Sequence, residues 1–361
     1  MSLSRAKIKQ LRRSLLAWYQ QEGRTLPWRD SSDAYGIWIA EIMLQQTQVK
    51  TVIPYYQRWL SQFPTVEALA GADLQQVLKA WQGLGYYARA RNLHKAAKIV
   101  VEQYQGKFPN QLEAVLKLPG IGRTTVGGIL SAAFNQPISI LDGNVKRVLA
   151  RLTALTVPPP KALKDLWQLS DILLDPKHPG TFNQAIMDLG ATVCLPKTPN
   201  CQQCPWKTHG PAYLSNLQHQ LPMREADHPL PHKIIGVAVI WNEPGQILID
   251  KRPAKGLLGG LWEFPGGKLE ANETIEECIR REIREELAIE VEVGSHLITL
   301  EHAYTHFRVT LHVYHCRHIG GEPQPIECDE IRWVTLDEID QYPFPKANEK
   351  IIDAIIAAKT S

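Results

Sequence analysis

The chain has 361 residues, with 40 Lys and Arg against 37 Asp and Glu and a net charge of +3. This length is enough for two domains that each bury a core of their own. No apolar run approaches the ~18 residues of a membrane span, and residues 1–30 lack the apolar segment of a secretion signal, so we expect a cytoplasmic protein without a membrane anchor. The six cysteines then fit reduced thiols or a metal site better than a disulfide framework.

Charge is divided unevenly along the chain. Residues 1–225 hold 26 Lys and Arg against 14 Asp and Glu, whereas residues 226–361 hold 14 against 23. An excess of basic residues suits binding to a polyanion, because each cation neutralises a phosphate. A solvated basic surface would show the same excess, so charge alone leaves both interpretations open.

Helical periodicity extends from residue 4 to residue 190. Residues 4–22 are amphipathic, whereas residues 37–44 carry apolar side chains on every side of a helical wheel around Glu41. Burial of that carboxyl raises its pKa toward the range of a general acid, although a Glu that makes a structural hydrogen bond in a polar cleft would fit the same pattern. We expect further helices and an all-α first domain, with the helices at 66–82, 88–104, 111–117, 123–134, 144–155, 162–174 and 181–190.

The segment from 118 to 145 predicts a hairpin, a helix and a loop that ends in a carboxylate. Leu118-Pro119-Gly120-Ile121-Gly122 contains two glycines that allow a tight turn with positive φ. A helix then begins at Arg123, and its free N–H groups suit a phosphate oxygen. Asp142 follows an apolar helix and a Pro-containing loop, so a bend positions it. An ordinary helix–turn–helix joint with an N-capping Asp is the alternative.

These segments resemble the helix–hairpin–helix DNA glycosylases, the superfamily of endonuclease III, and within it the MutY-type adenine DNA glycosylases. The resemblance covers nearly the whole chain and rests on motifs that occur in the family's order, namely Leu26-Pro27-Trp28-Arg29, Glu41-Ile42-Met43-Leu44-Gln45-Gln46-Thr47, Gly83-Leu84-Gly85-Tyr86-Tyr87, residues 118–122 and Leu141-Asp142-Gly143-Asn144-Val145. It implies a monomeric, nucleoid-associated enzyme of base excision repair. Its substrate would be double-stranded DNA in which adenine is mispaired with 8-oxoguanine or guanine.

The resemblance also implies a role for each motif residue. Glu41 would protonate adenine N7, Asp142 would remain charged beside the sugar, and Asn144 would orient Asp142. DNA contacts are implied for two intercalating side chains and for the hairpin, namely Gln46, Tyr86, Leu118, Gly120, Gly122 and Thr124. Related glycosylase/lyases carry a Lys where this chain has Thr124, so we expect a monofunctional enzyme. A lesion-binding module without catalysis is a further reading, which the Glu41 and Asp142 pair disfavours.

A cysteine loop follows the helical part. Cys194, Cys201 and Cys204 have the spacing C-x6-C-x2-C. The iron–sulfur loop of the family continues with five residues and a fourth Cys, but Gly210 occupies that position here and His209 precedes it. Three thiolates with His209 are compatible with a [4Fe–4S] cluster or a tetrahedral zinc ion, and a loop that folds without metal is the third reading.

The pattern changes to strands after residue 233. Strands are expected at 234–240 and 246–250, and residues 267–289 resemble the Nudix box, G-x5-E-x7-R-E-U-x-E-E-x-G-U, in which U is a bulky aliphatic residue and only the late Gly departs, to Ala288. Glu282, Glu285 and Glu286 share one helix face and predict a Mg²⁺ site. A solvated face neutralised by arginines is the alternative. The C-terminal domain would then be also, or instead, a Mg²⁺-dependent 8-oxo-dGTP pyrophosphohydrolase of MutT type.

Strands at 296–301 and 307–315 and a helix at 346–358 complete the chain. Between these strands, Tyr304-Thr305-His306 resembles the Phe-Ser-His segment with which MutY C-terminal domains contact 8-oxoguanine; a polar strand connection is the alternative. We therefore expect a multidomain chain of α and α+β classes. Its parts are an all-α helix–hairpin–helix glycosylase domain (1–192), the cysteine loop (193–210), a Pro-containing linker (211–232) and a Nudix-like α/β/α domain (233–361).

Overall fold

The computed structural model describes residues 3–29, 31–225, 229–304 and 307–360. It divides into two compact units, of which the first contains residues 1–70 and 95–227 and the second contains residues 71–94 and 228–361. The helix α6 (Ala88–Tyr104) contributes to both units. None of the helices in the described part of the chain is both long and apolar enough to cross a membrane.

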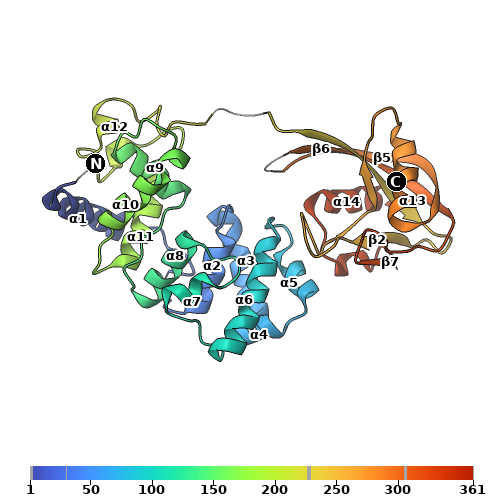
Figure 1. The fold of residues 1–361 in the computed structure, drawn as a ribbon, viewed down its shortest axis with the longest axis horizontal. Helices are drawn as coiled ribbons and strands as arrows, with labels where there is room; N and C mark the ends of the chain where they lie inside the picture. Colours follow the sequence, from blue (N-terminus) through green and yellow to red (C-terminus); the bar gives the residue numbers. More distant parts are fainter. Residues whose placement is uncertain (1–2, 30, 226–228, 305–306, 361) are drawn as a thin grey trace. The chain divides into compact units, whose positions relative to one another are not determined.

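The first unit is helical, as predicted, and its described residues contain no strand. Figure 1 shows its helices, which are α1 (Arg5–Glu22), α2 (Ala34–Met43), α3 (Val49–Gln62), α4 (Val66–Gly71), α7 (Leu112–Leu116), α8 (Arg123–Phe134), α9 (Gly143–Leu152), α10 (Leu163–Leu173), α11 (Pro179–Asp188) and α12 (Pro211–Leu214). Apolar side chains of α1, α9, α10 and α11 form one core, and α8 packs against α2. This packing brings α2, which carries Glu41, into contact with α8, the helix that follows the hairpin at residues 118–122.

The second unit contains a mixed sheet with the strand order β3-β2-β1-β6-β5, in which β4 also pairs with β1 and β7 with β2. Its strands are β1 (His232–Trp241), β2 (Ile247–Lys251), β3 (Trp262–Glu263), β4 (Gly266–Lys268), β5 (Glu290–Ala303), β6 (Arg308–Gly320) and β7 (Glu330–Val334). The strands β1 and β6 run parallel with Val237 opposite Val313. We refer to the described residues from 229 onward as the C-terminal domain.

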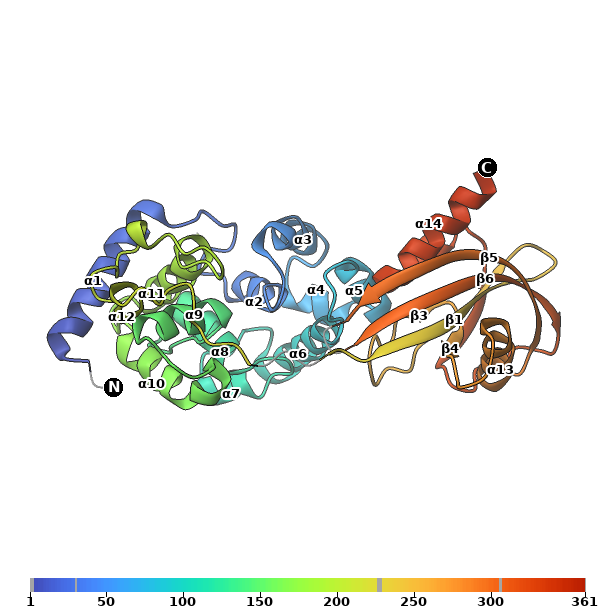
Figure 2. The same ribbon diagram turned by 90° about the horizontal axis from the view of Figure 1, so that it is seen from above.

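Alternating side chains of β1 form two cores on the two faces of this sheet. Val237 and Val239 pack with α14 (Lys346–Thr360), whereas Ala238 and Ile240 pack with α13 (Ile275–Leu287). A helix thus covers each face, as Figure 2 shows, and the expected α/β/α fold is confirmed. Residues 71–94, with α5 (Leu74–Trp81), complete the second unit.

Four local expectations need correction. The helix expected at 66–82 is two helices, because Asp73 caps a new one through a hydrogen bond from Gln75 N at 2.7 Å. The helix α3 was not expected, and neither were the short strands β3, β4 and β7, which depend on partners far away in sequence. The segment expected as a linker begins with a folded part: Ala212 and Leu221 are buried, and Arg151 Nε donates to the Leu221 carbonyl at 2.9 Å.

Candidate active site

Glu41 lies on α2, whose first turn is capped by Asp33, which accepts hydrogen bonds from the N–H groups of Tyr35 and Gly36. From residue 35 to residue 43 every residue is buried except Glu41, which is half-buried and has its carboxyl at the protected end of the side chain. Burial of its carboxyl, followed by the nearby charge of Asp142, raises the pKa of Glu41 to about 7, and Arg29 opposes this rise. The carboxyl therefore retains its proton in a large fraction of molecules at neutral pH.

The hairpin helix α8 leaves room for this carboxyl at a glycine. A Cβ built on Gly128 would lie 2.7 Å from Cδ of Glu41, well inside ordinary van der Waals distance. Glu41 thus occupies a cradle that a side chain at position 128 would fill. The sequence offered a weak signal for this contact, two adjacent glycines in an otherwise apolar helix.

Asp142 is the N-cap of α9, as its alternative reading expected. Its Oδ1 accepts a hydrogen bond from Val145 N at 2.7 Å, and Asn144 Nδ2 lies 3.5 Å from Oδ2. Burial raises the pKa of Asp142 above its ordinary value, although the Val145 N–H and the charge of Arg147 limit this rise. Both groups favour the charged form of Asp142, whereas for Glu41 only the charge of Arg29 opposes the rise in pKa.

Arg147 continues this network into the cysteine loop. Its NH2 donates to Asn144 Oδ1 at 2.8 Å and to the Gly190 carbonyl at 2.7 Å, and its Nε donates to the Cys194 carbonyl at 2.7 Å. Sequence reasoning did not single out Arg147. Arg147 is three residues after Asn144, one helical turn away, and this spacing was the available signal.

Glu41 and Asp142 line the same cavity, which has a volume of about 570 Å³. Asn144 and Gln46 also line it, so the structure brings four of the expected site residues together. Trp28, Arg29 and Arg147 belong to its walls as well. Arg29 is held by the fully buried Asp188, through 2.7 Å bonds to both carboxylate oxygens, and Arg24 binds the same carboxylate.

The hairpin differs in one respect from expectation. Gly120 has φ 81°, but Gly122 has φ −103° and serves as the N-cap of α8, so only the first glycine uses the left-handed region. No atom lies within 4 Å of a Cβ built on Gly122, which leaves its surroundings open. Leu118 is buried under the turn, and Thr124 Oγ1 donates to the Leu141 carbonyl at 3.3 Å, next to Asp142.

Tyr86 belongs to the second unit. Its φ is 49°, and Gln46 likewise has a positive φ of 58°. Both expected intercalating residues therefore adopt a backbone conformation that is uncommon outside glycine.

Three cysteines come together in the loop after α11. Cys194, Cys201 and Cys204 line one small apolar cavity, and Gly210 lines it where a fourth sulfur was expected. His209 is absent from the lining; its Nδ1 lies 2.8 Å from Lys7 Nζ instead. Burial raises the pKa of the Cys204 thiol to about 12.

Arg151 also stabilises this loop. Its guanidinium lies 3.2 Å from Cys194 Sγ and donates to the Leu195 and Pro196 carbonyls. Within the described ranges, no three His, Cys, Asp or Glu side chains are arranged to hold a metal ion. The donor set present here does not fit a [4Fe–4S] cluster or a zinc ion with four protein ligands, so His209 as a ligand is a prediction that the structure does not support.

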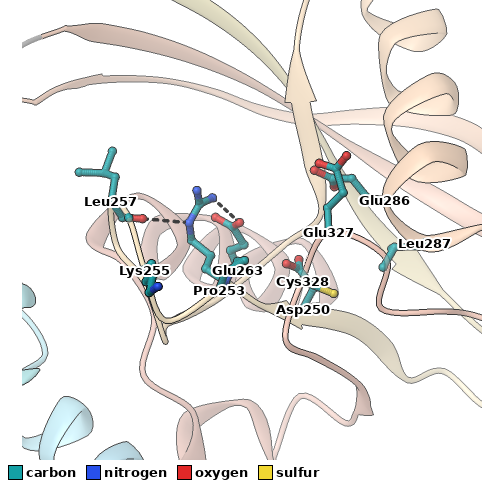
Figure 3. A pocket seen from close by; sticks show the side chains of 11 residues that line it. Asp250, Pro253, Lys255, Leu257, Glu263, Glu286, Leu287, Glu327 and Cys328 are labelled. Carbon is teal, nitrogen blue, oxygen red and sulfur yellow. Dashed lines mark hydrogen bonds and ion pairs between the residues drawn. The ribbon is translucent and has the colours of Figure 1, made fainter.

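The three carboxylates of the Nudix box do not share one environment. Arg281 NH1 binds Glu282 at 2.8 Å and Glu285 at 3.2 Å, as the alternative reading expected of an arginine. Glu286 instead faces another cavity, of about 220 Å³, whose acidic lining residues include Asp250 and Glu327 (Figure 3). Burial, followed by nearby acidic charges, raises the pKa of Glu286 to about 8. The three box carboxylates do not form a metal-binding group in the described structure.

One further expected residue lies in the C-terminal domain. Tyr304 N donates to the Phe307 carbonyl at 2.8 Å, and the Tyr304 ring packs against those of Phe307 and His302. The two residues that would complete the recognition segment, Thr305 and His306, lie outside the described residues.

Comparison with known proteins supports this two-part organisation. Residues 39–170 match the HhH-GPD superfamily base excision DNA repair protein family, and residues 236–354 match the NUDIX domain family. Adenine DNA glycosylase from Homo sapiens is 36% identical over 406 residues, which cover 96% of this chain and 74% of the human protein. Adenine DNA glycosylase from Buchnera aphidicola subsp. Baizongia pistaciae is 42% identical over 253 residues, covering 70% of this chain and 72% of that protein.

Solved structures show a similar first part. A thermostable thymine-DNA glycosylase is 27% identical, covers 58% of this chain and 98% of its own, and has a TM-score of 0.53. A non-covalent endonuclease III–DNA complex, at 20% identity and a TM-score of 0.50, shares the fold over 60% of this chain. Both parts of the chain are thus similar to known families, and the first part contains a cavity lined by the two expected carboxylates. The chain therefore belongs to the adenine DNA glycosylase family, enzymes of base excision repair with a helix–hairpin–helix domain and a Nudix domain.

Proposed function

We propose that this chain, as a monomer, hydrolyses the N-glycosidic bond of adenine mispaired with 8-oxoguanine or guanine in double-stranded DNA, and that Glu41 and Asp142 carry the reaction. The observation that supports the two roles is one shared cavity with two different carboxyl environments. Glu41 has a pKa of about 7, whereas Asp142 accepts a backbone hydrogen bond and lies near Arg147. One acid that keeps its proton beside one that keeps its charge is the arrangement required for cleavage of a glycosidic bond.

The reaction begins when adenine leaves the base stack, which costs a few kcal/mol. Glu41 donates its proton to adenine N7, so that the base leaves as a better leaving group and takes the electrons of the C1′–N9 bond. Asp142 stabilises the positive charge that develops on the sugar, and water adds to C1′ and releases a proton to solvent, from which Glu41 regains its own. Asn144 and Arg147 orient the Asp142 carboxylate.

Thr124 supports a monofunctional reaction. A lyase needs an amine that forms a Schiff base with the sugar, and the hydroxyl of Thr124 cannot form one. The product would be an intact strand with an abasic site. Reduction with borohydride during turnover should trap no stoichiometric covalent complex, and a stoichiometric yield would contradict this assignment.

Contacts with the DNA backbone are proposed for the hairpin and for a neighbouring basic cavity. The N-terminus of α8 presents unpaired N–H groups beside Gly120, which suits a phosphate oxygen. A cavity of about 550 Å³ shares Arg147 with the active-site cavity and is also lined by Lys146, His219 and Arg224. These cations would neutralise phosphates of the strand that leaves the site. Gln46 and Tyr86 would fill the gap left by the extruded base.

Recognition of 8-oxoguanine is proposed for the C-terminal domain, through Tyr304, Thr305 and His306. The Thr305 hydroxyl would bind the edge of the oxidised base, in the role of the Ser in the family's Phe-Ser-His segment. Excision of adenine opposite 8-oxoguanine and opposite guanine, measured with the full chain and with residues 1–225, tests this division. A fragment that excises adenine but retains the full preference for 8-oxoguanine would refute it.

Substitution of the two carboxyls tests the catalytic assignment. We expect Asp142→Asn and Glu41→Gln each to reduce the single-turnover excision rate by at least ~100-fold, since each removes a group that acts in the transition state. Glu113→Gln, on the exposed surface of α7, is the matched control and should keep the wild-type rate. An Asp142→Asn variant with the wild-type rate would leave only a lesion-binding function.

A second activity would be hydrolysis of 8-oxo-dGTP by Mg²⁺ at the Nudix box. The presence of the box and the acidic cavity beside Glu286 favour it, but Arg281 already binds Glu282 and Glu285. These carboxyls do not fit Mg²⁺ in this arrangement, so we derive no reaction step through it. Mg²⁺-dependent release of pyrophosphate from 8-oxo-dGTP by the full chain, abolished in Glu286→Gln, would establish this activity, and no release would exclude it.

A further inference from the structure

The loop between α5 and α6 holds an aromatic residue in an unfavourable backbone conformation. Gly83 and Gly85 have φ of 94° and 72°, and Tyr86 has φ 49°. The left-handed region suits glycine, but it is sparsely populated by bulky residues. Tyr86 nevertheless exposes 47% of its surface. The loop therefore maintains a strained conformation in which an aromatic ring is presented to solvent.

The side chain of Arg89 stabilises this loop through hydrogen bonds and ring contacts. Its NH2 donates to the carbonyls of Leu84 and Gly85, both at 3.0 Å, and Trp81 Nε1 donates to the same Gly85 carbonyl at 3.0 Å. The Arg89 guanidinium also lies 5.1 Å from the centre of the Trp81 ring and 5.6 Å from that of Tyr86. Burial lowers the pKa of Arg89 to about 10, so it remains a cation at neutral pH. A buried cation thus holds the shape of the loop.

Tyr87 links the loop to the C-terminal domain. Its hydroxyl accepts a hydrogen bond from Gly83 N at 3.4 Å and donates to the Phe344 carbonyl at 3.2 Å. Tyr87 is 4% exposed and Phe344 1% exposed, and the Phe344 ring stacks on Phe264 beside the sheet. One buried oxygen therefore joins the backbone of the loop to the core of the domain.

Neighbouring contacts of the same unit support this link. Gln82 Nε2 lies 2.5 Å from Glu349 Oε1, and Lys79 Nζ donates to the Tyr342 carbonyl at 3.3 Å. Helices α5 and α14 both belong to the second unit. The loop and the C-terminal domain thus form parts of one compact body although residues 95–227 separate the two segments in sequence.

We propose that Tyr87 is a positioning residue that couples Tyr86 to the C-terminal domain, so that binding of 8-oxoguanine by that domain favours insertion of Tyr86 into the base stack. This inference rests on the proposed function, in which Tyr86 intercalates and the C-terminal domain reads the oxidised base. The coupling requires both hydrogen bonds of the Tyr87 hydroxyl. Arg89 maintains the loop geometry on which the coupling acts.

Tyr87→Phe in the full chain tests the proposal, because it removes both hydrogen bonds and keeps the ring. A net contribution of about 1 kcal/mol from these bonds corresponds to roughly a fivefold to tenfold change in an equilibrium. We therefore expect the ratio of single-turnover rates, 8-oxoguanine·A over G·A, to fall about fivefold to tenfold, mostly through a slower reaction on 8-oxoguanine·A. Fluorescence of a 2-aminopurine in place of adenine should show the same loss in base extrusion.

Tyr35→Phe is the matched control. Its buried hydroxyl donates to the Phe63 carbonyl at 2.8 Å in the first unit, so this variant loses a similar bond elsewhere. Thermal unfolding of both variants measures the stability loss that they share. A Tyr35→Phe variant that loses the 8-oxoguanine preference as Tyr87→Phe does would overturn the proposal, since general destabilisation would then explain both.

A double-mutant cycle separates this inference from the proposed function. We expect Tyr86→Ala to lower the rate ratio, and Tyr87→Phe to lower it no further in the Tyr86→Ala background. Additive effects, or an unchanged ratio in Tyr87→Phe alone, would refute the coupling and leave the proposed role of Tyr86 intact. An unchanged ratio in Tyr86→Ala would refute both. If Tyr87→Phe unfolds, Arg89→Lys in the same cycle is the second test and should show the same non-additivity.

Discussion

A methyl group at position 128 should disturb catalysis more than folding. A Cβ on Gly128 would lie 2.7 Å from Cδ and Oε2 of Glu41, whereas carbon atoms normally approach to 3.5–4.0 Å, so the carboxyl must move by about 1 Å. The stability terms nearly cancel. Ala is favoured over Gly inside a helix by about 1 kcal/mol, and overpacking costs about 1–3 kcal/mol.

The effect of this substitution on the excision rate has no opposing contribution. A displacement of about 1 Å in a reacting group reduces a rate by about 100-fold, which corresponds to about 2.7 kcal/mol of transition-state stabilisation. We therefore expect Gly128→Ala to lower the single-turnover rate of adenine excision about 100-fold. The melting temperature should change by only a few degrees, since about 1 kcal/mol shifts it by about 2–4 °C in a protein of this size class.

Two glycines provide controls for Gly128→Ala. No atom lies within 4 Å of a Cβ built on Gly71, at the end of α4, so Gly71→Ala should leave the rate unchanged and should not lower the stability. A Cβ on Gly127 would lie 2.3 Å from the Ser139 carbonyl oxygen, so Gly127→Ala must shift backbone and should destabilise the fold more than Gly128→Ala. A Gly128→Ala enzyme with the wild-type rate, or with a rate loss equal to its unfolded fraction, would refute the cradle for Glu41.

Three further outcomes follow from the same structure. Because Glu41 acts as an acid with a pKa of about 7, the excision rate should fall tenfold per pH unit above that value, and Glu41→Gln should abolish this dependence; a flat profile from pH 6 to 9 would contradict the role. Asp188→Asn should lower the free energy of unfolding in urea by about 3–5 kcal/mol, because it leaves Arg29 without its buried partner, whereas the exposed Asp165→Asn should change it by less than about 0.5 kcal/mol. Prolonged treatment with a chelator should alter neither the melting temperature nor the rate, because Gly210 replaces the fourth thiolate; loss of bound iron together with activity would refute this.

Local sequence features predicted where the candidate site residues stand along the chain. Glu41 stands inside an all-apolar helix and Asp142 at a bend, and these local features are written in consecutive residues. The helix bounds at 88–104 and 123–134 agree with the structure for the same reason, since periodicity and end signals are local. The strands expected around residue 240 and residue 310 follow a local alternation as well.

Local patterns could not predict contacts between residues that are distant in sequence. Gly128 makes room for Glu41 only because α8 packs on α2, and His209 contacts Lys7 across about 200 residues instead of facing the cysteines. The strand β7 exists only through its pairing with β2.

By itself the sequence determined which residues can donate protons, carry charge or bind phosphate, and which segments form long helices, because these properties depend on side-chain chemistry and local periodicity. Only the tertiary structure decided which of them meet. It placed Glu41 and Asp142 in the wall of one cavity. It also paired the Nudix-box residues Glu282 and Glu285 with Arg281, and it joined the loop that contains Tyr86 to the C-terminal domain. The physical reason is that burial and pairing are properties of packed surfaces, and packing joins elements far apart in the chain.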